Sequence, residues 1–141
     1  MPKRILIMGL PGAGKTTLAE QLKKELEKTS SVTWLNADKI REEYNDWDFT
    51  ESGRLRQSKR MHSLAILSKT DYVIADFVAP LEQMRQNFKA DWTIWVDTIS
   101  EGRYNDTNQL FQHPTQFNFR VTEQAAEKWA KTIAADIIES K

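Results

Sequence analysis

The sequence has 141 residues, of which 40% are hydrophobic, which is enough for one domain with a buried core. Twenty Lys and Arg residues balance twenty Asp and Glu residues, whereas a dedicated nucleic-acid or membrane-surface binder needs a basic excess. The lack of cysteine excludes disulfides and thiolate metal sites, and two histidines disfavour a zinc enzyme. The sequence therefore predicts one domain over residues 1–141 with neither a nucleic-acid nor a membrane partner.

The beginning of the chain carries no signal-peptide pattern, because an apolar stretch of strand length follows almost at once. The sequence also lacks an apolar run of about 18 residues, the length that a membrane-spanning helix needs. We therefore expect a cytoplasmic protein.

The most informative stretch runs from Gly9 to Thr16 and matches the phosphate-binding pattern G-x-x-x-x-G-K-[ST] at every fixed position. An apolar stretch at residues 4–8 precedes it, and leucines at 18, 22 and 26 follow it on one helical face. A glycine-rich turn that binds nothing is the alternative, but a loop between a buried strand and an amphipathic helix favours a nucleotide site.

The residue types of this loop suit a triphosphate. Glycines let the backbone bend so that successive N–H groups form an anion nest, with the helix dipole aimed at the same point. Lys15 can reach the β- and γ-phosphates of ATP, and the Thr16 hydroxyl can bind Mg²⁺. The expected ATP-binding residues are Gly9, Leu10, Pro11, Gly12, Ala13, Gly14, Lys15, Thr16 and Thr17.

Strand and helix patterns alternate along the rest of the chain. Strands are expected at residues 4–8, 31–36, 72–77, 92–96 and 118–121. Helices are expected from about Lys15 to Leu26, over 37–44, from Thr50 or Ser52 to about 69, over 81–89, and after a cap at Thr122. Residues 100–117 show no period, so we expect an irregular, mobile lid there.

This alternation predicts an α/β fold, a five-stranded parallel sheet with helices on both faces. Ligands of such sheets bind beyond the carboxyl ends of the strands. That rule gathers the phosphate-binding loop with three later segments, at residues 36–38, 76–80 and 97–103.

Two carboxylates are candidate metal or catalytic groups. Asp38, near the end of the second strand, could accept a proton from the acceptor hydroxyl or hold a Mg²⁺-bound water; the alternative is a helix N-cap. Asp76 ends an apolar strand, where a second Mg²⁺-side carboxylate is expected; the alternative is a structural turn. The predicted metal site thus comprises Thr16, Asp38 and Asp76, with ATP and Mg²⁺ as cofactors.

Several later motifs carry a family resemblance. Residues 35–41 read L-N-A-D-x-x-R against L-D-G-D-x-x-R, and residues 77–80 read F-V-A-P against F-I-S-P. Between them, Phe49-Thr50 leads to G-R-x-x-Q-x-x-R at residues 53–60, where the family has F-S and D-R-x-x-N-x-x-R. With the V-D-T at 96–98, these motifs resemble adenylylsulfate kinases, which transfer the γ-phosphate of ATP to the 3′-hydroxyl of adenosine 5′-phosphosulfate.

The resemblance implies a P-loop kinase fold, a small-molecule nucleotide substrate and specific residue roles. Arg41 and Arg54 would clamp the phosphosulfate, and Phe49 and Phe77 would sandwich its adenine. Gln57 and Val78 would complete the substrate pocket. Lys15, Asp38 and the lid residue Arg103 would be the catalytic residues. Family members are often dimers, so the resemblance allows a homodimer, although no exposed apolar stripe demands one.

Each substrate-binding role has a purely structural alternative. The arginines could lie on a solvated helix face, and the phenylalanines could pack in the core. The sequence also departs from the family: Asn36 replaces an aspartate, Asp76 replaces a small residue, and the lid after Arg103 lacks the usual lysine. The chain resembles a shortened member with an atypical lid. Two other functions therefore stay open, a kinase for another nucleotide, a nucleoside or a sugar, and a nucleotide-binding protein without transferase activity.

Overall fold

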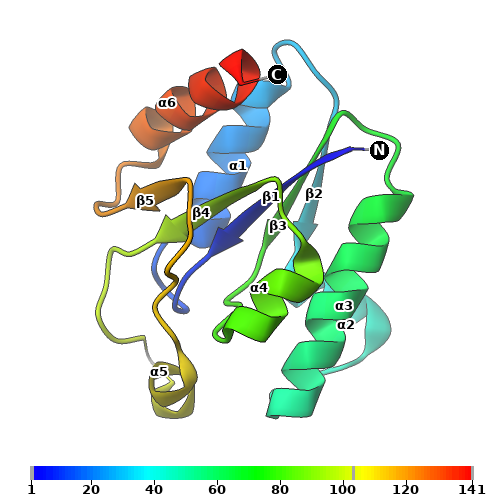
Figure 1. Cartoon of the computed structure of the whole chain (residues 1–141), viewed down its shortest axis with the longest axis vertical. Coiled ribbons are helices and arrows are strands. Elements are labelled where there is room, and N and C mark those ends of the chain that lie inside the picture. The colour runs from blue at the N-terminus through cyan, green and yellow to red at the C-terminus, as the bar shows by residue number, and fades with distance from the viewer. Residues whose placement is uncertain (1, 103, 141) are drawn as a thin grey trace.

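The structure, a computed structural model, describes residues 2–102 and 104–140. Its strands form one parallel sheet in the order β2-β3-β1-β4-β5 (Figure 1). In chain order the strands are β1 (Lys3–Met8), β2 (Val32–Asn36), β3 (Tyr72–Asp76), β4 (Trp92–Val96) and β5 (Phe119–Val121). The predicted parallel α/β sheet is therefore confirmed.

Helices cover both faces of the sheet, with α1 and α6 on one side and α3 and α4 on the other (Figure 1). The helices in the described part of the chain are α1 (Lys15–Leu26), α2 (Ala37–Tyr44), α3 (Glu51–Leu67), α4 (Glu82–Phe88), α5 (Asn105–Leu110) and α6 (Ala126–Glu139).

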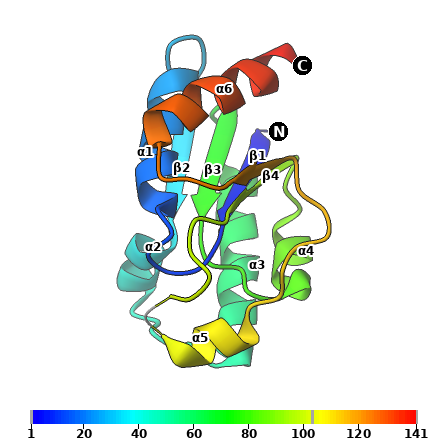
Figure 2. The same ribbon diagram turned by 90° about the vertical axis from the view of Figure 1, so that its left-hand side faces the viewer.

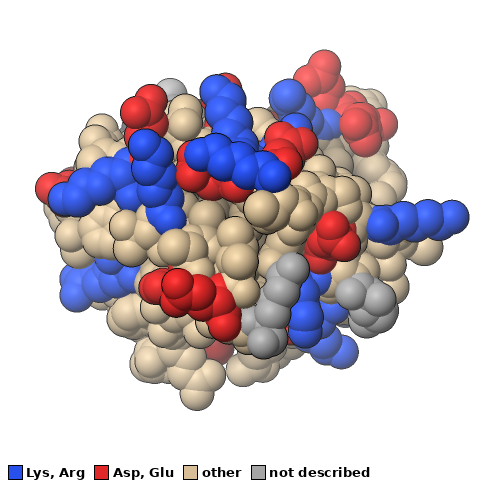
Figure 3. Space-filling model, turned by 90° about the horizontal axis from the view of Figure 1, so that it is seen from above, with Lys and Arg blue, Asp and Glu red and all other residues tan. Residues whose placement is uncertain are grey.

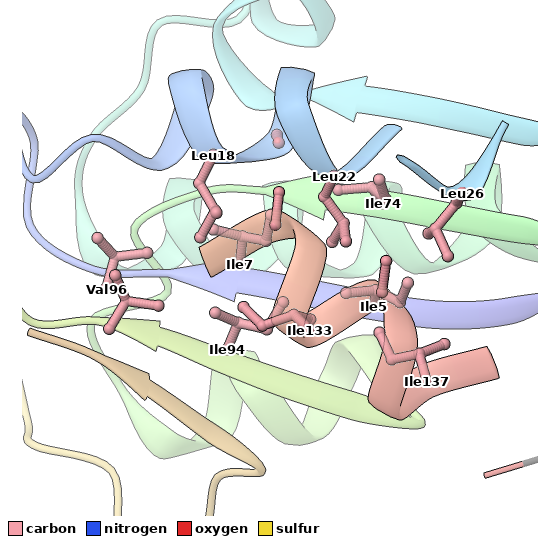
Figure 4. Packing of buried hydrophobic residues seen from close by; sticks show 14 of the residues in the cluster. Ile5, Ile7, Leu18, Leu22, Leu26, Ile74, Ile94, Val96, Ile133 and Ile137 are labelled. Atoms are coloured by element: carbon pink, nitrogen blue, oxygen red, sulfur yellow. The ribbon is translucent and has the colours of Figure 1, made fainter. Parts of the chain in front are cut away.

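The core consists of two clusters separated by the sheet, because successive strand side chains point to opposite faces. Ile5 and Ile7 of β1 pack with the leucines of α1 and with Ile133 of α6 (Figure 4). Leu6 and Met8, the alternate β1 residues, pack toward α3 and α4. All four β1 side chains are fully buried, as expected for a central parallel strand.

Several predicted boundaries need correction. Residues 100–117 are not irregular throughout, because α5 forms within them. The last helix begins at Ala126 with Ala125 at its cap, so Thr122 is not the cap. The third strand ends at Asp76, one residue earlier than expected. Of the two candidate caps for α3, Thr50 is the one whose side chain accepts a hydrogen bond, from the Gly53 N–H.

The carboxyl ends of the strands point toward the end of the molecule that α5 crosses (Figure 2). Both chain termini lie at the opposite end, where Lys and Arg side chains alternate with Asp and Glu (Figure 3). Among the described helices, none combines the length and apolar character needed to cross a membrane.

Candidate active site

The phosphate-binding loop joins β1 to α1 and depends on its glycines. Gly9 has a φ of 152°, and a Cβ there would lie 2.5 Å from the Val96 carbonyl oxygen. Gly14, directly before α1, has a φ of 104°, which L side chains rarely adopt. The Thr98 hydroxyl donates to the Ala13 carbonyl at 2.6 Å and so fixes the loop to the end of β4.

Lys15 begins α1 and is buried. Its Nζ donates to the Leu10 carbonyl at 3.1 Å, so the side chain lies over its own loop. Burial lowers the pKa of Lys15, while the carboxylates of Asp76 and Asp38 act in the opposite direction. The loop thus holds a desolvated cation close to two anions, as a phosphate-binding lysine requires.

A hydrogen-bond network connects the loop to the second and third strands. Asn36 Nδ2 donates to Asp76 Oδ2 at 3.1 Å and lies 3.4 Å from the Thr16 hydroxyl. Trp34 Nε1 donates to the same Asp76 oxygen at 2.7 Å. Burial raises the pKa of Asp76, and the hydrogen bonds from Trp34 and Asn36 and the charge of Lys15 partly offset this rise.

Asn36 also caps α2, since its side-chain oxygen accepts the Lys39 N–H at 3.1 Å. The suggestion that Asp38 is the cap is therefore wrong; Asp38 lies exposed in the first turn of α2. Sequence reasoning treated Asn36 only as a departure from a motif and missed Trp34, because nothing in the sequence shows which residues face Asp76.

The residues around Thr16 suit a magnesium ion bound together with ATP. Within residues 2–102 and 104–140, no group of three or more His, Cys, Asp or Glu side chains could hold a metal alone. Mg²⁺ usually takes one or two carboxylates together with substrate phosphates and waters. The exposed Thr16 hydroxyl and the Asp38 and Asp76 carboxylates, near the phosphate-binding loop, provide such oxygen ligands.

A cleft of about 740 Å³ extends from the phosphate-binding loop across the carboxyl end of the sheet. Lys15, Thr16 and Asp76 line it at the loop, and Phe49, Phe77 and Val78 line it further away. Asp38 also lines it, and Tyr104 and Thr107 contribute the α5 side. The cleft joins three of the four expected segments, those at the loop and at residues 36–38 and 76–80. Within the described chain α5, rather than residues 97–102, forms the remaining wall.

A smaller pocket of about 60 Å³ adjoins the cleft and shares Asp38, Phe49 and Phe77 with it. Arg41 and Gln57 line this inner pocket. Phe77 is buried and belongs to the core cluster that faces α3 and α4, so the core-packing alternative holds for it, and it also lines the cleft. Phe49 is 48% exposed, which excludes core packing.

The two predicted clamp arginines are buried, which excludes a solvated helix face. Arg41 Nη1 donates to the Asp46 and Asp48 carbonyls, and its guanidinium lies 4.3 Å from the Phe49 ring centroid. Arg54 Nε donates to the Phe49 carbonyl at 2.8 Å, and its Nη2 donates to the Thr107 hydroxyl at 2.9 Å. Both arginines thus hold the segment that carries Phe49, and Arg54 also contacts α5.

Gln57 and Arg103 are the remaining predicted residues of the acceptor pocket and the lid. Gln57 is buried, and its Nε2 donates to the Ala37 carbonyl at 3.2 Å, which fixes the start of α2 above the inner pocket. Arg103, the predicted lid arginine, lies outside the described residues. Sequence reasoning missed Trp47, Tyr104 and Thr107, which line the cleft.

The adenylylsulphate kinase family model matches residues 1–112. The chain belongs to the adenylylsulphate kinase family. The Mycobacterium tuberculosis APS kinase CysC, solved in complex with AMPPNP and APS, is 21% identical with a TM-score of 0.80, and the match covers 98% of each chain. The crystal structure of APE1195 is 22% identical with a TM-score of 0.83, over 98% of this chain and 96% of that one.

Other small-molecule kinases share the fold. The shikimate kinase from Aquifex aeolicus vf5 is 14% identical with a TM-score of 0.68, over 97% of each chain. A comparison with curated proteins gave no match. The P-loop kinase fold predicted from the sequence is therefore confirmed, and this member of the adenylylsulphate kinase family is an ATP-dependent kinase.

Proposed function

We propose that this kinase transfers the γ-phosphate of ATP, bound with Mg²⁺, to the 3′-hydroxyl of adenosine 5′-phosphosulfate. One observation carries the proposal: a single cleft joins the phosphate-binding loop to a wall bearing Phe49, Phe77 and Arg54, with Asp38 between them. Aromatic rings and a guanidinium match a purine and an oxyanion. The match to the family model and the likeness to the mycobacterial structure support this acceptor.

The residues of the cleft divide into donor and acceptor roles. The loop N–H groups and Lys15 hold the β- and γ-phosphates and stabilise the charge that develops during transfer. Mg²⁺, when bound by Thr16 and Asp76 with one of its waters held by Asp38, would neutralise further charge on the phosphates. Phe49 and Phe77 bind the purine, and Val78 and Gln57 complete its pocket.

In the transfer itself, the acceptor 3′-oxygen forms a bond to the γ-phosphorus while the bond from that phosphorus to the ADP oxygen breaks. We assign the role of proton acceptor to Asp38, which is exposed to the cleft and occupies no capping position. Arg41 and Arg54 bind the phosphosulfate from beside Phe49, and Arg103 keeps its proposed role of stabilising the charge on the transferred phosphoryl group.

An acceptor panel tests the proposal. The purified protein is incubated with ATP and Mg²⁺ and with adenosine 5′-phosphosulfate, AMP, adenosine, shikimate or gluconate, and ADP release is measured. The product is identified by chromatography, and Lys15→Ala serves as the control for contaminating kinases. We expect turnover with adenosine 5′-phosphosulfate above all others and a 3′-phosphorylated product. Faster turnover with another acceptor would refute the substrate assignment, and tight ATP binding without any transfer would refute catalysis.

A further inference from the structure

Trp47 lies in the short connection between α2 and α3 and lines the cleft. Its side chain is 51% exposed, and its ring lies 6.4 Å from the Phe49 ring between centroids. A large apolar ring gains free energy from burial, so a tryptophan that is half exposed forgoes about half of this gain in folding.

The backbone on both sides of Trp47 is nevertheless held by a buried arginine. Arg41 Nη1 donates to the carbonyl of Asp46 at 3.0 Å and to the carbonyl of Asp48 at 3.1 Å. These two residues flank Trp47 directly. The single residue between the two fixed carbonyls is the one whose side chain is exposed to the cleft.

The flanking carboxylates are held as well, by arginines of α3. Asp46 accepts from Arg56 Nε and from Arg60 Nη2, each at 2.9 Å. Asp48 accepts from Arg56 Nη2 at 3.2 Å and from the Thr50 hydroxyl at 2.6 Å. A connection of this length would otherwise be mobile, so these contacts offset the entropic cost of ordering the segment that carries Trp47.

The position of Trp47 indicates which ligand it meets. The phosphate-binding loop fixes the triphosphate, whereas Trp47 neighbours Phe49, which also lines the inner pocket away from that loop. A rigid planar ring at such a place suits a flat π system, since aromatic side chains stack on nucleic-acid bases with little dependence on the base. Sugars and shikimate lack such a surface.

We infer that Trp47 is a specificity-determining residue: together with the neighbouring Phe49 ring it forms the aromatic wall that stacks on one face of the acceptor base, opposite Phe77, and it restricts the acceptor to nucleotides. This rests on the proposed function and deepens it. The ordered connection pre-positions the indole, so little conformational freedom is lost on binding. Removing the ring should weaken acceptor binding by about tenfold or more, the range found for single stacked bases.

The experiment compares Trp47→Ala with Trp47→Phe. The KM values for adenosine 5′-phosphosulfate and ATP are measured together with kcat. Binding of AMP is titrated with the ATP site saturated by AMPPNP and Mg²⁺, and ribose 5-phosphate is the probe that lacks a base. Phe117→Ala is the matched control. Phe117 is also a half-exposed aromatic residue, at 40%, but it lies just before β5 and does not line the cleft.

We expect Trp47→Ala to raise the acceptor KM and the AMP Kd by about tenfold or more while the KM for ATP and the ribose 5-phosphate affinity stay unchanged. Trp47→Phe should restore most of the affinity but abolish the part of the AMP-induced fluorescence change that arises from Trp47. Phe117→Ala should leave all four quantities unchanged.

An unchanged acceptor KM and AMP Kd in Trp47→Ala would overturn the inference, and so would an effect on ATP alone. If Trp47→Ala did not fold, a fluorescence response to AMP that persists fully in Trp47→Phe would overturn it equally. A failure of the proposed function would look different. The wild-type protein would then not phosphorylate adenosine 5′-phosphosulfate, but AMP binding would still be weaker in Trp47→Ala than in wild type.

Discussion

Asn36 makes two structural hydrogen bonds with its one side chain. Its oxygen caps α2, and its amide nitrogen donates to Asp76, its register partner on β3. The family motif has an aspartate at this position, and the strand beside it ends in a small residue. In this chain the carboxylate is Asp76 on β3, and the residue beside it on β2 is Asn36. The Asn36 amide donates a hydrogen bond to Asp76, whereas an aspartate at position 36 would repel it. The two departures thus compensate each other.

The first prediction concerns Asn36→Asp. Two carboxylates would then face each other, so Asp76, whose pKa burial already raises, would be harder to ionise. A raised pKa in the folded state means that stability falls as pH rises from the unfolded value, about 3.9, through the folded one. We expect Asn36→Asp to be less stable than wild type by about 1–3 kcal/mol at pH 8, with the difference shrinking toward pH 5.

Urea unfolding at several pH values, without nucleotide or metal, measures this. Asn36→Ala is the control, because it loses the cap and the donor without adding a charge. Its deficit should depend less on pH than that of Asn36→Asp. Parallel pH profiles for the two variants would contradict the account of a compensated pair.

The second prediction concerns Lys15→Ala. The lysine is buried in the loop and desolvated, where a positive charge acts strongly on phosphate. Its loss should reduce kcat by about 10²–10³, the range for removing one preorganised charge stabiliser. Lys24→Ala, on the exposed side of α1 in an ion pair with Glu20, should keep the wild-type rate. A wild-type kcat in Lys15→Ala would contradict the assignment of Lys15 as the residue that stabilises the charge on the phosphates.

Among the elements, α1 and α5 differ in how far the sequence specifies them. Leucines at fixed helical spacing predict α1, and they are buried as expected. The six residues of α5 are mainly polar and too few to form a stable helix alone. Tertiary contacts hold it: Asn108 bonds to both the N–H and the carbonyl of Gly102, and Thr107 accepts from Arg54. No periodic pattern could have predicted these contacts.

The candidate site likewise contains some residues that a local sequence pattern predicts and others that only tertiary contacts bring into place. Spacing alone identified the phosphate-binding loop, because its motif is local. Partners such as Trp34 and Asp76 depend on the register of β2 with β3, and the exposed face of Trp47 depends on ion pairs with α3. Sequence reasoning therefore found the residues of the motifs and missed those that adjacent elements bring to them.

The third prediction concerns the contact between α3 and α5. Thr107→Val keeps the shape of the side chain but removes the oxygen that accepts from the buried Arg54 guanidinium. A hydrogen bond to a charged group contributes about 1.5–3 kcal/mol, so amides of residues 105–110 should exchange hydrogen about 10- to 100-fold faster. Thr107→Ser should restore slow exchange. Equal exchange in all three proteins would show that this contact does not hold α5.

At the scale of the whole molecule, most of the core lies apart from the cleft, although Phe77 belongs to both. The two hydrophobic clusters lie on the faces of the sheet, whereas the cleft lies across its carboxyl end. Core substitutions away from Phe77 should therefore change stability without changing the site. The mixed charges at the opposite end of the molecule (Figure 3) give that surface no single sign that would attract a polyanion.

The fourth prediction separates these two places with one measurement, thermal unfolding with and without ATP and Mg²⁺. Leu22 is fully buried between α1 and the sheet, so Leu22→Ala should cost about 2–5 kcal/mol. Its nucleotide site is intact, so ligand at about 100 times Kd should still add about 2.7 kcal/mol, as in wild type. Without ligand, the free energy of unfolding of Lys15→Ala should lie within about 1 kcal/mol of the wild-type value. Addition of ATP and Mg²⁺ should raise it much less than in wild type. A smaller ligand gain in Leu22→Ala than in wild type would show that the core and the site are coupled, because folding linkage alone leaves the gain of an intact site unchanged.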